Sequence, residues 1–206
     1  MEDANHWASL EDVRSEAIVC CRCDLCHTRT HVVFGEGPPG ARAMIVGEGP
    51  GREEDESARP FVGRAGKLLD RLLCDAGLDR SAIWITNIVR CRPTASADGE
   101  VANRPPKTSE VRACDIWTAA TYGFIDPCLV MCLGGRSAQA LLGEGFRIGE
   151  RRGRWHVGRF GKPTTATYHP AYVLRLRGAD RQRVEEQMVR DLVMIRSEME
   201  QLQSAA

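Results

Sequence analysis

Four short apolar runs alternate with helix-like segments along the chain, and this alternation limits the possible folds more than any other feature. The runs cover residues 43–46, 83–86, 129–133 and 164–167. Helical patterns cover residues 8–20, 64–76, 109–123, 136–142 and 180–203. Ser109 is the expected N-cap of the third of these helices. Strands that alternate with helices favour a parallel sheet covered by helices on both faces. We therefore predict an α/β fold.

The bulk properties of the chain are those of an ordinary globular protein. Its 206 residues suit a single domain spanning residues 1–206, and 43% hydrophobic residues suffice for a full core. No apolar run approaches the ~20 residues of a membrane span. The first residues are acidic and polar, unlike a signal peptide. We expect a monomeric, cytoplasmic protein with no membrane contact.

The formal net charge of the chain is zero, so the chain as a whole does not attract a nucleic acid by its charge. Such a partner requires positive charge gathered on one face. The most basic stretch contains Arg147, Arg151, Arg152, Arg154, Arg159 and Lys162. We expect this stretch to contribute to a phosphate-facing surface. The polar segment 92–108 is expected to form a loop beside the site described next.

Unusual residues stand where each predicted strand ends. Gly47–Gly51, with Glu48 inside the glycine turn, follows the first strand, and Asn87 ends the second. Gly134–Gly135 follows the third strand, and His169 follows the fourth. Ligands of open α/β sheets bind at the carboxyl ends of the strands. The convergence predicts an active site at one edge of the sheet.

Each of these residues also has a common structural interpretation. Asn87 is suited to cap a strand, but its amide can also read the edge of a base with a donor and an acceptor. A lone histidine is usually structural, yet His169 shares its edge with Glu48 and Asn87. Phe61 is either a core residue or a platform on which a base stacks. The acidic run 53–55 is typical of a solvated helix start.

The cysteines indicate a metal site, because disulfides are rare in a reducing compartment. They are Cys20, Cys21, Cys23, Cys26, Cys74, Cys91, Cys114, Cys128 and Cys132. Cys20 with Cys23, and Cys23 with Cys26, both have chelating spacing, and Cys91 and Cys114 are the distant candidates. Four thiolates hold either zinc or an iron–sulfur cluster, and the spacing leaves both open. Burial in apolar segments explains Cys74, Cys128 and Cys132.

Several motifs in order resemble the family-4 uracil-DNA glycosylases, the iron–sulfur branch of their superfamily. The resemblance runs from Cys20 to about Arg175. Its landmarks are Cys20-x-x-Cys23-x-Leu25, Arg29-Thr30, Val33-Phe-Gly-Glu-Gly37, Gly47-Glu-Gly-Pro-Gly51 with Glu54-Asp55, Arg59-Pro-Phe-Val-Gly63, Thr86-Asn-Ile-Val-Arg-Cys-Arg-Pro93, Gly153-Arg-Trp155 and His169-Pro-Ala-Tyr-Val-Leu-Arg175.

The resemblance implies a three-layer α/β/α fold with a four-stranded parallel sheet. It implies a [4Fe–4S] cluster on Cys20, Cys23, Cys91 and Cys114, with Cys20 favoured over Cys26. It also implies that the substrate is uracil-containing DNA, and that the base is flipped into a pocket at the strand ends.

Roles follow from the resemblance position by position. Phe61 resembles the ring that stacks on the flipped uracil, Asn87 the residue that reads its edge, and Gly49 a further part of the base pocket. His169 resembles the donor to uracil O2 as negative charge develops on the leaving base.

Two acidic and two DNA-facing residues complete the expected site. Glu48 and Glu54 are the candidates for handling water and shaping the pocket. Family-1 enzymes carry an aspartate where this chain has Gly49, which leaves the water-handling group open. Leu174 and Arg175 are the candidates for a wedge in the emptied base stack and for a phosphate contact.

Two other functions are consistent with the same residues. One is a nucleic-acid-binding module with an inactive pocket and a cluster or zinc ion. The other is a glycosylase for another deaminated base, such as hypoxanthine. A related branch traps uracil-DNA covalently through a histidine in a basic loop after the third cysteine ligand. Residues 92–108 contain no histidine, so we expect water to be the final nucleophile and the enzyme to be monofunctional.

Overall fold

The computed structural model describes residues 6–97 and 100–204. Residues 1–5 of the acidic N-terminal segment, residues 98–99 of the polar segment and residues 205–206 lie outside the described residues. The centre of the fold is a sheet with the strand order β2-β1-β5-β7-β6. Its strands are β1 (Ala43–Gly47), β2 (Ile83–Asn87), β5 (Leu129–Leu133), β6 (His156–Val157) and β7 (Pro163–Thr167).

The four strands β2, β1, β5 and β7 are parallel, as expected. The structure corrects the strand count, because β6 adds a short fifth strand antiparallel to β7. A turn at residues 158–161 folds β6 back, with the Gly158 amide donating to the Lys162 carbonyl at 3.0 Å. The register pairs Gly47 with Asn87. The last residues of β1 and β2 therefore lie side by side at one edge.

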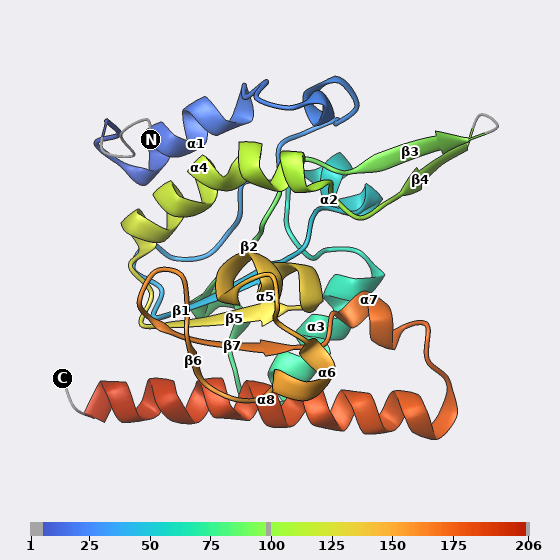
Figure 1. Cartoon of the computed structure of the whole chain (residues 1–206). Helices are drawn as coiled ribbons and strands as arrows, with labels where there is room; N and C mark the ends of the chain where they lie inside the picture. The colour runs from blue at the N-terminus through green and yellow to red at the C-terminus, as the bar shows by residue number, and fades with distance from the viewer. Residues whose placement is uncertain (1–5, 98–99, 205–206) are drawn as a thin grey trace.

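Helices cover both faces of this sheet, so the three-layer prediction is confirmed (Figure 1). One layer contains α3 (Arg64–Asp75), α7 (Pro170–Val173) and α8 (Gly178–Ser204). The other contains α1 (Leu10–Ile18), α4 (Thr108–Ile125), α5 (Gly135–Leu142) and the short α6 (Ile148–Arg151). Within β1, Ile45 packs into the core beside α3 and α8, while Met44 and Val46 pack into the core beside α1 and α4. This alternation holds both layers on the sheet.

The acidic run forms α2 (Arg52–Ser57), but the expectation of a solvated helix start is wrong for two of its carboxylates. Glu54 and Asp55 are buried. Both carboxylate oxygens of Asp55 accept the amide N–H of Thr30 at 3.0 Å, and Glu54 accepts the Gly63 amide at 2.8 Å. Backbone donors supply the stabilisation that water gives an exposed acid.

The segment 92–108 is not a plain loop. It contains the antiparallel strands β3 (Thr94–Ala97) and β4 (Glu100–Asn103), which form a hairpin that projects from the body of the protein (Figure 1). The following helix α4 begins at Thr108, so Lys107 rather than Ser109 is its N-cap. The Glu110 carboxylate accepts the Lys107 amide at 2.7 Å. The remaining elements are the 3-10 helices η1 (Asp24–His27) and η2 (Arg80–Ala82).

Within the described residues, no helix has both the length and the apolar character required to cross a membrane.

Candidate active site

A cleft of about 980 Å³ opens at the carboxyl edge of the sheet, where the sequence predicted a site. Loops after β1, β2 and β7 form its floor, and the base of the β3–β4 hairpin forms one wall. The predicted residues outside the cysteine group that line it are Glu48, Gly49, Glu54, Phe61, Asn87, His169, Leu174 and Arg175. The structure therefore brings all eight together.

His169 caps the N-terminus of α7 and is held in one tautomer. Its Nδ1 accepts the amide N–H of Ala171 at 3.1 Å. Burial, reinforced by the positive charge of Arg175, lowers the pKa of His169 to about 4. The ring is therefore neutral at pH 7, and because Nδ1 is an acceptor its one proton lies on Nε2. His169 offers the cleft a neutral N–H donor.

The lowered pKa of His169 predicts a pH-dependent loss of stability. The unfolded histidine, with a pKa near 6.5, binds a proton at a higher pH than the folded one. The stability that the neutral His169 contributes is therefore fully present above pH 6.5 and is lost as the pH falls toward 4. When the pH is lowered from 7.5 to 5, we expect the free energy of unfolding of the wild type to fall by about 2 kcal/mol more than that of His169→Gln. Urea unfolding at both pH values measures this difference, and equal losses would contradict the assignment.

Asn87 ends β2 with its side chain only 1% exposed. Its Oδ1 atom has no hydrogen-bond partner among the described residues. Gly47 in the neighbouring strand makes this placement possible, because a Cβ atom there would lie 2.4 Å from both Asn87 Oδ1 and Phe61 Cζ. A buried amide oxygen without a partner is costly. It is therefore suited to accept a hydrogen bond from a ligand in the cleft.

The Phe61 ring lies beside His169, with their ring centroids 5.9 Å apart. Its backbone has a φ of +52°, which is unusual for a residue with a side chain. Gly66 allows this conformation, because a Cβ at that position would lie 1.8 Å from the Phe61 carbonyl oxygen. The chain thus accepts local strain to direct an aromatic ring at the cleft.

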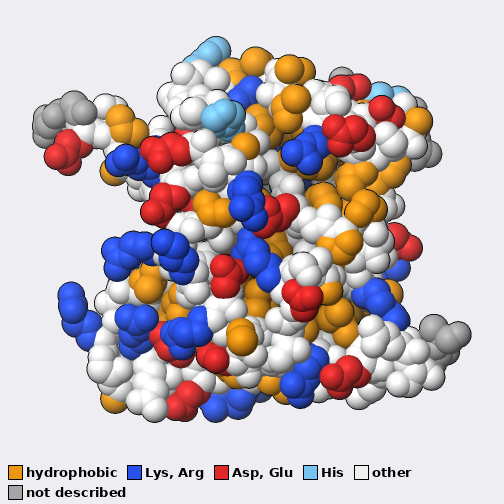
Figure 2. Space-filling model, turned by 180° about the vertical axis from the view of Figure 1, so that it is seen from behind, with side chains coloured by type: hydrophobic (Ala, Val, Ile, Leu, Met, Phe, Trp, Pro, Cys, Tyr) orange, Lys and Arg blue, Asp and Glu red, His pale blue; other side chains and the backbone are white. Residues whose placement is uncertain are grey.

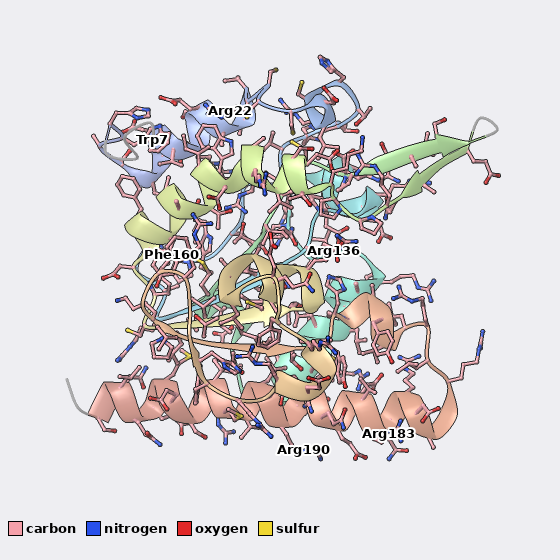
Figure 3. The ribbon with its side chains drawn as sticks, viewed as in Figure 1. Trp7, Arg22, Arg136, Phe160, Arg183 and Arg190 are labelled. Carbon is pink, nitrogen blue, oxygen red and sulfur yellow. The ribbon has the colours of Figure 1, made fainter. Side chains whose placement is uncertain are left out.

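The two candidate glutamates have different surroundings. Glu54 accepts backbone amides of Gly51 at 3.1 Å, Val62 at 2.9 Å and Gly63 at 2.8 Å. Those bonds fix the loop that carries Phe61. Glu48 is half-buried and pairs at 3.4 Å with Arg136 of α5, which is labelled in Figure 3. Burial raises the pKa of Glu48 above its usual value, although the positive charge of Arg136 opposes this rise.

Positive charge borders the cleft, but not from the stretch that the sequence indicated. Arg52, Arg64, Arg104 and Arg175 line the cleft, and Figure 2 shows Lys and Arg side chains gathered below the projecting hairpin. None of the six basic residues between positions 147 and 162, all in the described part of the chain, lines it. Carboxylates pair with several of them instead, as Asp191 does with Arg152 at 2.7 Å.

The four predicted cysteine ligands converge on one small cavity. Cys20, Cys23, Cys91 and Cys114 all line it. Cys26 does not line it and instead lies beside Cys21. Burial raises the pKa of Cys91 to about 11 and that of Cys114 to about 12. These thiols thus require a bound cation to become thiolates at neutral pH.

N–H donors surround these sulfurs. Trp117 Nε1 lies 3.3 Å from Cys20 Sγ, Arg29 Nη1 lies 3.4 Å from Cys91 Sγ, and the Arg90 amide lies 3.3 Å from Cys114 Sγ. Sequence reasoning assigned no role to Trp117, Arg29 or Arg136, although Arg29 stands in one of the motifs. Among the described residues no group of three or more His, Cys, Asp or Glu side chains is close enough to chelate a single metal ion.

The cleft at the strand ends of this α/β/α fold thus brings together an aromatic ring, a buried amide and a neutral histidine. The family model described as "Uracil DNA glycosylase superfamily" matches residues 34–193. The type-4 uracil-DNA glycosylase of Sulfurisphaera tokodaii is 39% identical over 81% of this chain and 76% of its own. That of Thermotoga maritima is 38% identical over 85% and 88%.

A type-5 uracil-DNA glycosylase of Thermus thermophilus is more distant, at 31% identity over 66% of this chain and 68% of its own. The chain belongs to the uracil-DNA glycosylase superfamily, and within it to the type-4 enzymes.

Proposed function

We propose that this protein flips uracil out of DNA and hydrolyses its N-glycosidic bond, leaving an abasic site. The observation that carries this proposal is the pair formed by the unpartnered Asn87 amide and the neutral His169 donor in one cleft. An inactive binding module has no need to keep a costly unpartnered amide beside a desolvated histidine.

The cleft residues divide the reaction between them. Phe61 stacks on the flipped base, and the Asn87 amide reads its Watson–Crick edge. As the glycosidic bond breaks, negative charge develops on uracil O2, and His169 Nε2–H donates a hydrogen bond to that oxygen. A donor fixed in advance acts most strongly where charge appears in the transition state.

We assign to Glu48 the role of positioning or polarising the attacking water. Glu54 is occupied by three backbone amides and acts as a positioning residue for the Phe61 loop. Gly49 has no carboxylate, and a Cβ at this position would lie 2.8 Å from Val89 Cγ2. Its role is to let the base approach the backbone closely.

We also propose that Cys20, Cys23, Cys91 and Cys114 hold a [4Fe–4S] cluster. Their shared cavity and the N–H donors around their sulfurs support it. Bound there, the cluster supplies a covalent link between α4, the segment after β2 and the N-terminal residues. Zinc is the alternative, and metal analysis of anaerobically prepared protein distinguishes the two.

Leu174 and Arg175 are proposed to meet the DNA, Leu174 as the wedge and Arg175 at a phosphate. Both line the cleft, and Arg175 is exposed. We propose that the chain acts as one domain, because both hydrophobic clusters share the strands of one sheet. A monomeric state and a cytoplasmic location stay predictions.

The test of this function is excision from oligonucleotides that carry a single uracil, hypoxanthine or xanthine, followed by alkaline cleavage. We expect cleavage at uracil. Cleavage only at hypoxanthine or xanthine would identify a different glycosylase. Binding without cleavage of any substrate would identify an inactive module.

The enzyme is expected to turn over rather than trap its product. The part of segment 92–108 that the structure describes places hydroxyl groups, Lys107 and Glu100 near the hairpin, and the whole segment contains no histidine. Hydroxyls without an adjacent base are poor nucleophiles. Excess uracil-DNA should therefore be processed through several turnovers per enzyme. A protein–DNA band that survives boiling in detergent would contradict this expectation.

A further inference from the structure

Arg90 is a fully buried arginine to which the reaction above assigns no task. Its side chain is 1% exposed and stands in the segment between Asn87 and Cys91. Its Nη1 atom donates to the Asn87 carbonyl. Its Nη2 atom lies 3.4 Å from the Trp117 carbonyl oxygen and 3.5 Å from Thr121 Oγ1. The guanidinium thus joins the end of β2 to α4.

No carboxylate neutralises this cation among the described residues. Arg90 lines the same small cavity as Cys91 and Cys114, and its backbone amide lies 3.3 Å from Cys114 Sγ. The carbon of its guanidinium lies 5.9 Å from the centre of the Phe34 ring. Arginine keeps its charge in proteins, and a buried charge without a partner is strongly unfavourable. The fold therefore requires negative charge on the cysteine side of Arg90.

We propose that Arg90 is a positioning residue that compensates the negative charge of the four-thiolate iron–sulfur site and, through the same guanidinium, fixes the carbonyl of the uracil-reading Asn87. This inference rests on the proposed function and on the proposed cluster. It makes uracil recognition depend on the occupied cysteine site, although Asn87 touches neither the metal nor its ligands.

Two substitutions of Arg90 distinguish a role in charge compensation from a role in packing. Lysine keeps the charge but is a single point donor, so it cannot span Asn87 and α4 together. Methionine keeps the approximate volume and removes the charge. If Arg90 served only to fill space, Arg90→Met would be the milder change, because replacing a buried charge with an apolar group is often stabilising. Charge compensation predicts the opposite order.

The first experiment measures the cluster in the full-length, iron-loaded protein. Iron loss to a chelator is followed by the bleaching of visible absorption, and the midpoint potential is followed by voltammetry. We expect Arg90→Met to lose iron several-fold faster than Arg90→Lys. We also expect a more negative potential in Arg90→Met, because a nearby cation favours the reduced cluster. The matched control is Arg196→Met, at a partly exposed arginine of α8 that donates to the Ala76 carbonyl and does not line the cavity of the four predicted ligands.

The second experiment measures base recognition. Binding is compared between a duplex with a non-hydrolysable 2′-fluoro-deoxyuridine and one with an abasic analogue. Arg90→Lys should lower the preference for the uracil analogue about tenfold, while Arg196→Met leaves it unchanged. In an Asn87→Ala background the Arg90→Lys loss should largely disappear, because contacting residues that act as a unit are not additive.

Three results would overturn the inference. One is faster iron loss from Arg90→Lys than from Arg90→Met. Another is an unchanged uracil preference in Arg90→Lys, and the third is full additivity with Asn87→Ala. If the wild-type protein excises uracil and holds iron, any of these results refutes only the role of Arg90 and leaves the proposed cluster and function standing. Wild-type protein without iron or without excision refutes the proposed cluster or the proposed function instead.

Discussion

His169→Ala should slow single-turnover excision of uracil by roughly a hundredfold or more, the usual cost of losing one fixed donor in the transition state. The donor is prepared before the substrate binds, since the Ala171 amide holds Nδ1 at 3.1 Å and leaves the proton on Nε2. Substrate binding should change much less, because the hydrogen bond to O2 gains its strength only as the base leaves.

His156→Ala provides the matched control for this experiment. His156 lies in β6 and contacts Arg151 rather than the cleft. Its replacement should leave the excision rate unchanged. Rapid-quench assays with enzyme in excess over DNA measure the chemical step for both variants. Near-normal excision by His169→Ala would remove this residue from the mechanism.

Cys114→Ser should lose the metal and much of the protein's stability together. Cys114 lies in α4 and Cys91 follows β2, so a metal bound by both joins two separate parts of the fold. Because metal binding is coupled to folding, we expect the melting temperature to fall by about 10 °C or more. Iron analysis and thermal unfolding monitored by circular dichroism measure the two losses.

Two other cysteines serve as controls for the ligand assignment. Cys74 is exposed on α3, so the expectation that it is buried is wrong, and Cys26 lies outside the cavity of the four predicted ligands. Serine at either position should leave the iron content unchanged. Loss of iron from Cys26→Ser, with retention by Cys20→Ser, would show that Cys26 and not Cys20 completes the site.

The sheet and its functional edge were predictable because both depend on simple signals. The runs that became β1, β2 and β5 are continuous and largely apolar, which is typical of strands buried on both faces. The run that became β7 is rich in threonine, whose branched side chain favours strands. Parallel strands place their carboxyl ends at one edge, so Asn87 and His169 were expected near each other before the structure was known. Their hydrogen bonds and their neutral or unpartnered states required coordinates.

Other features left little or no local signal. The hairpin strands Thr94–Ala97 and Glu100–Asn103 have small or polar residues without an apolar alternation, so the segment resembled a loop. The acidic run suggested solvent because its partners, such as the amides of Thr30 and Gly63, lie elsewhere in the chain. The basic stretch after residue 146 does not line the cleft, and a count of charges along the sequence does not show distant partners such as Asp191. Its contribution to a phosphate-facing surface stays a prediction.

The β3–β4 hairpin starts three residues after Cys91, and its second strand leads into the helix that carries Cys114. One root of the hairpin thus lies close to the cysteine cavity, and the other is joined to that cavity through the start of α4. The described residues of the two strands pair with each other in a separate two-stranded sheet. Loop-closure entropy grows slowly with length, so residues added between β3 and β4 cost little and leave the sheet untouched. Insertions here can therefore alter the wall of the cleft that the hairpin forms, while the residues at the strand ends stay in place.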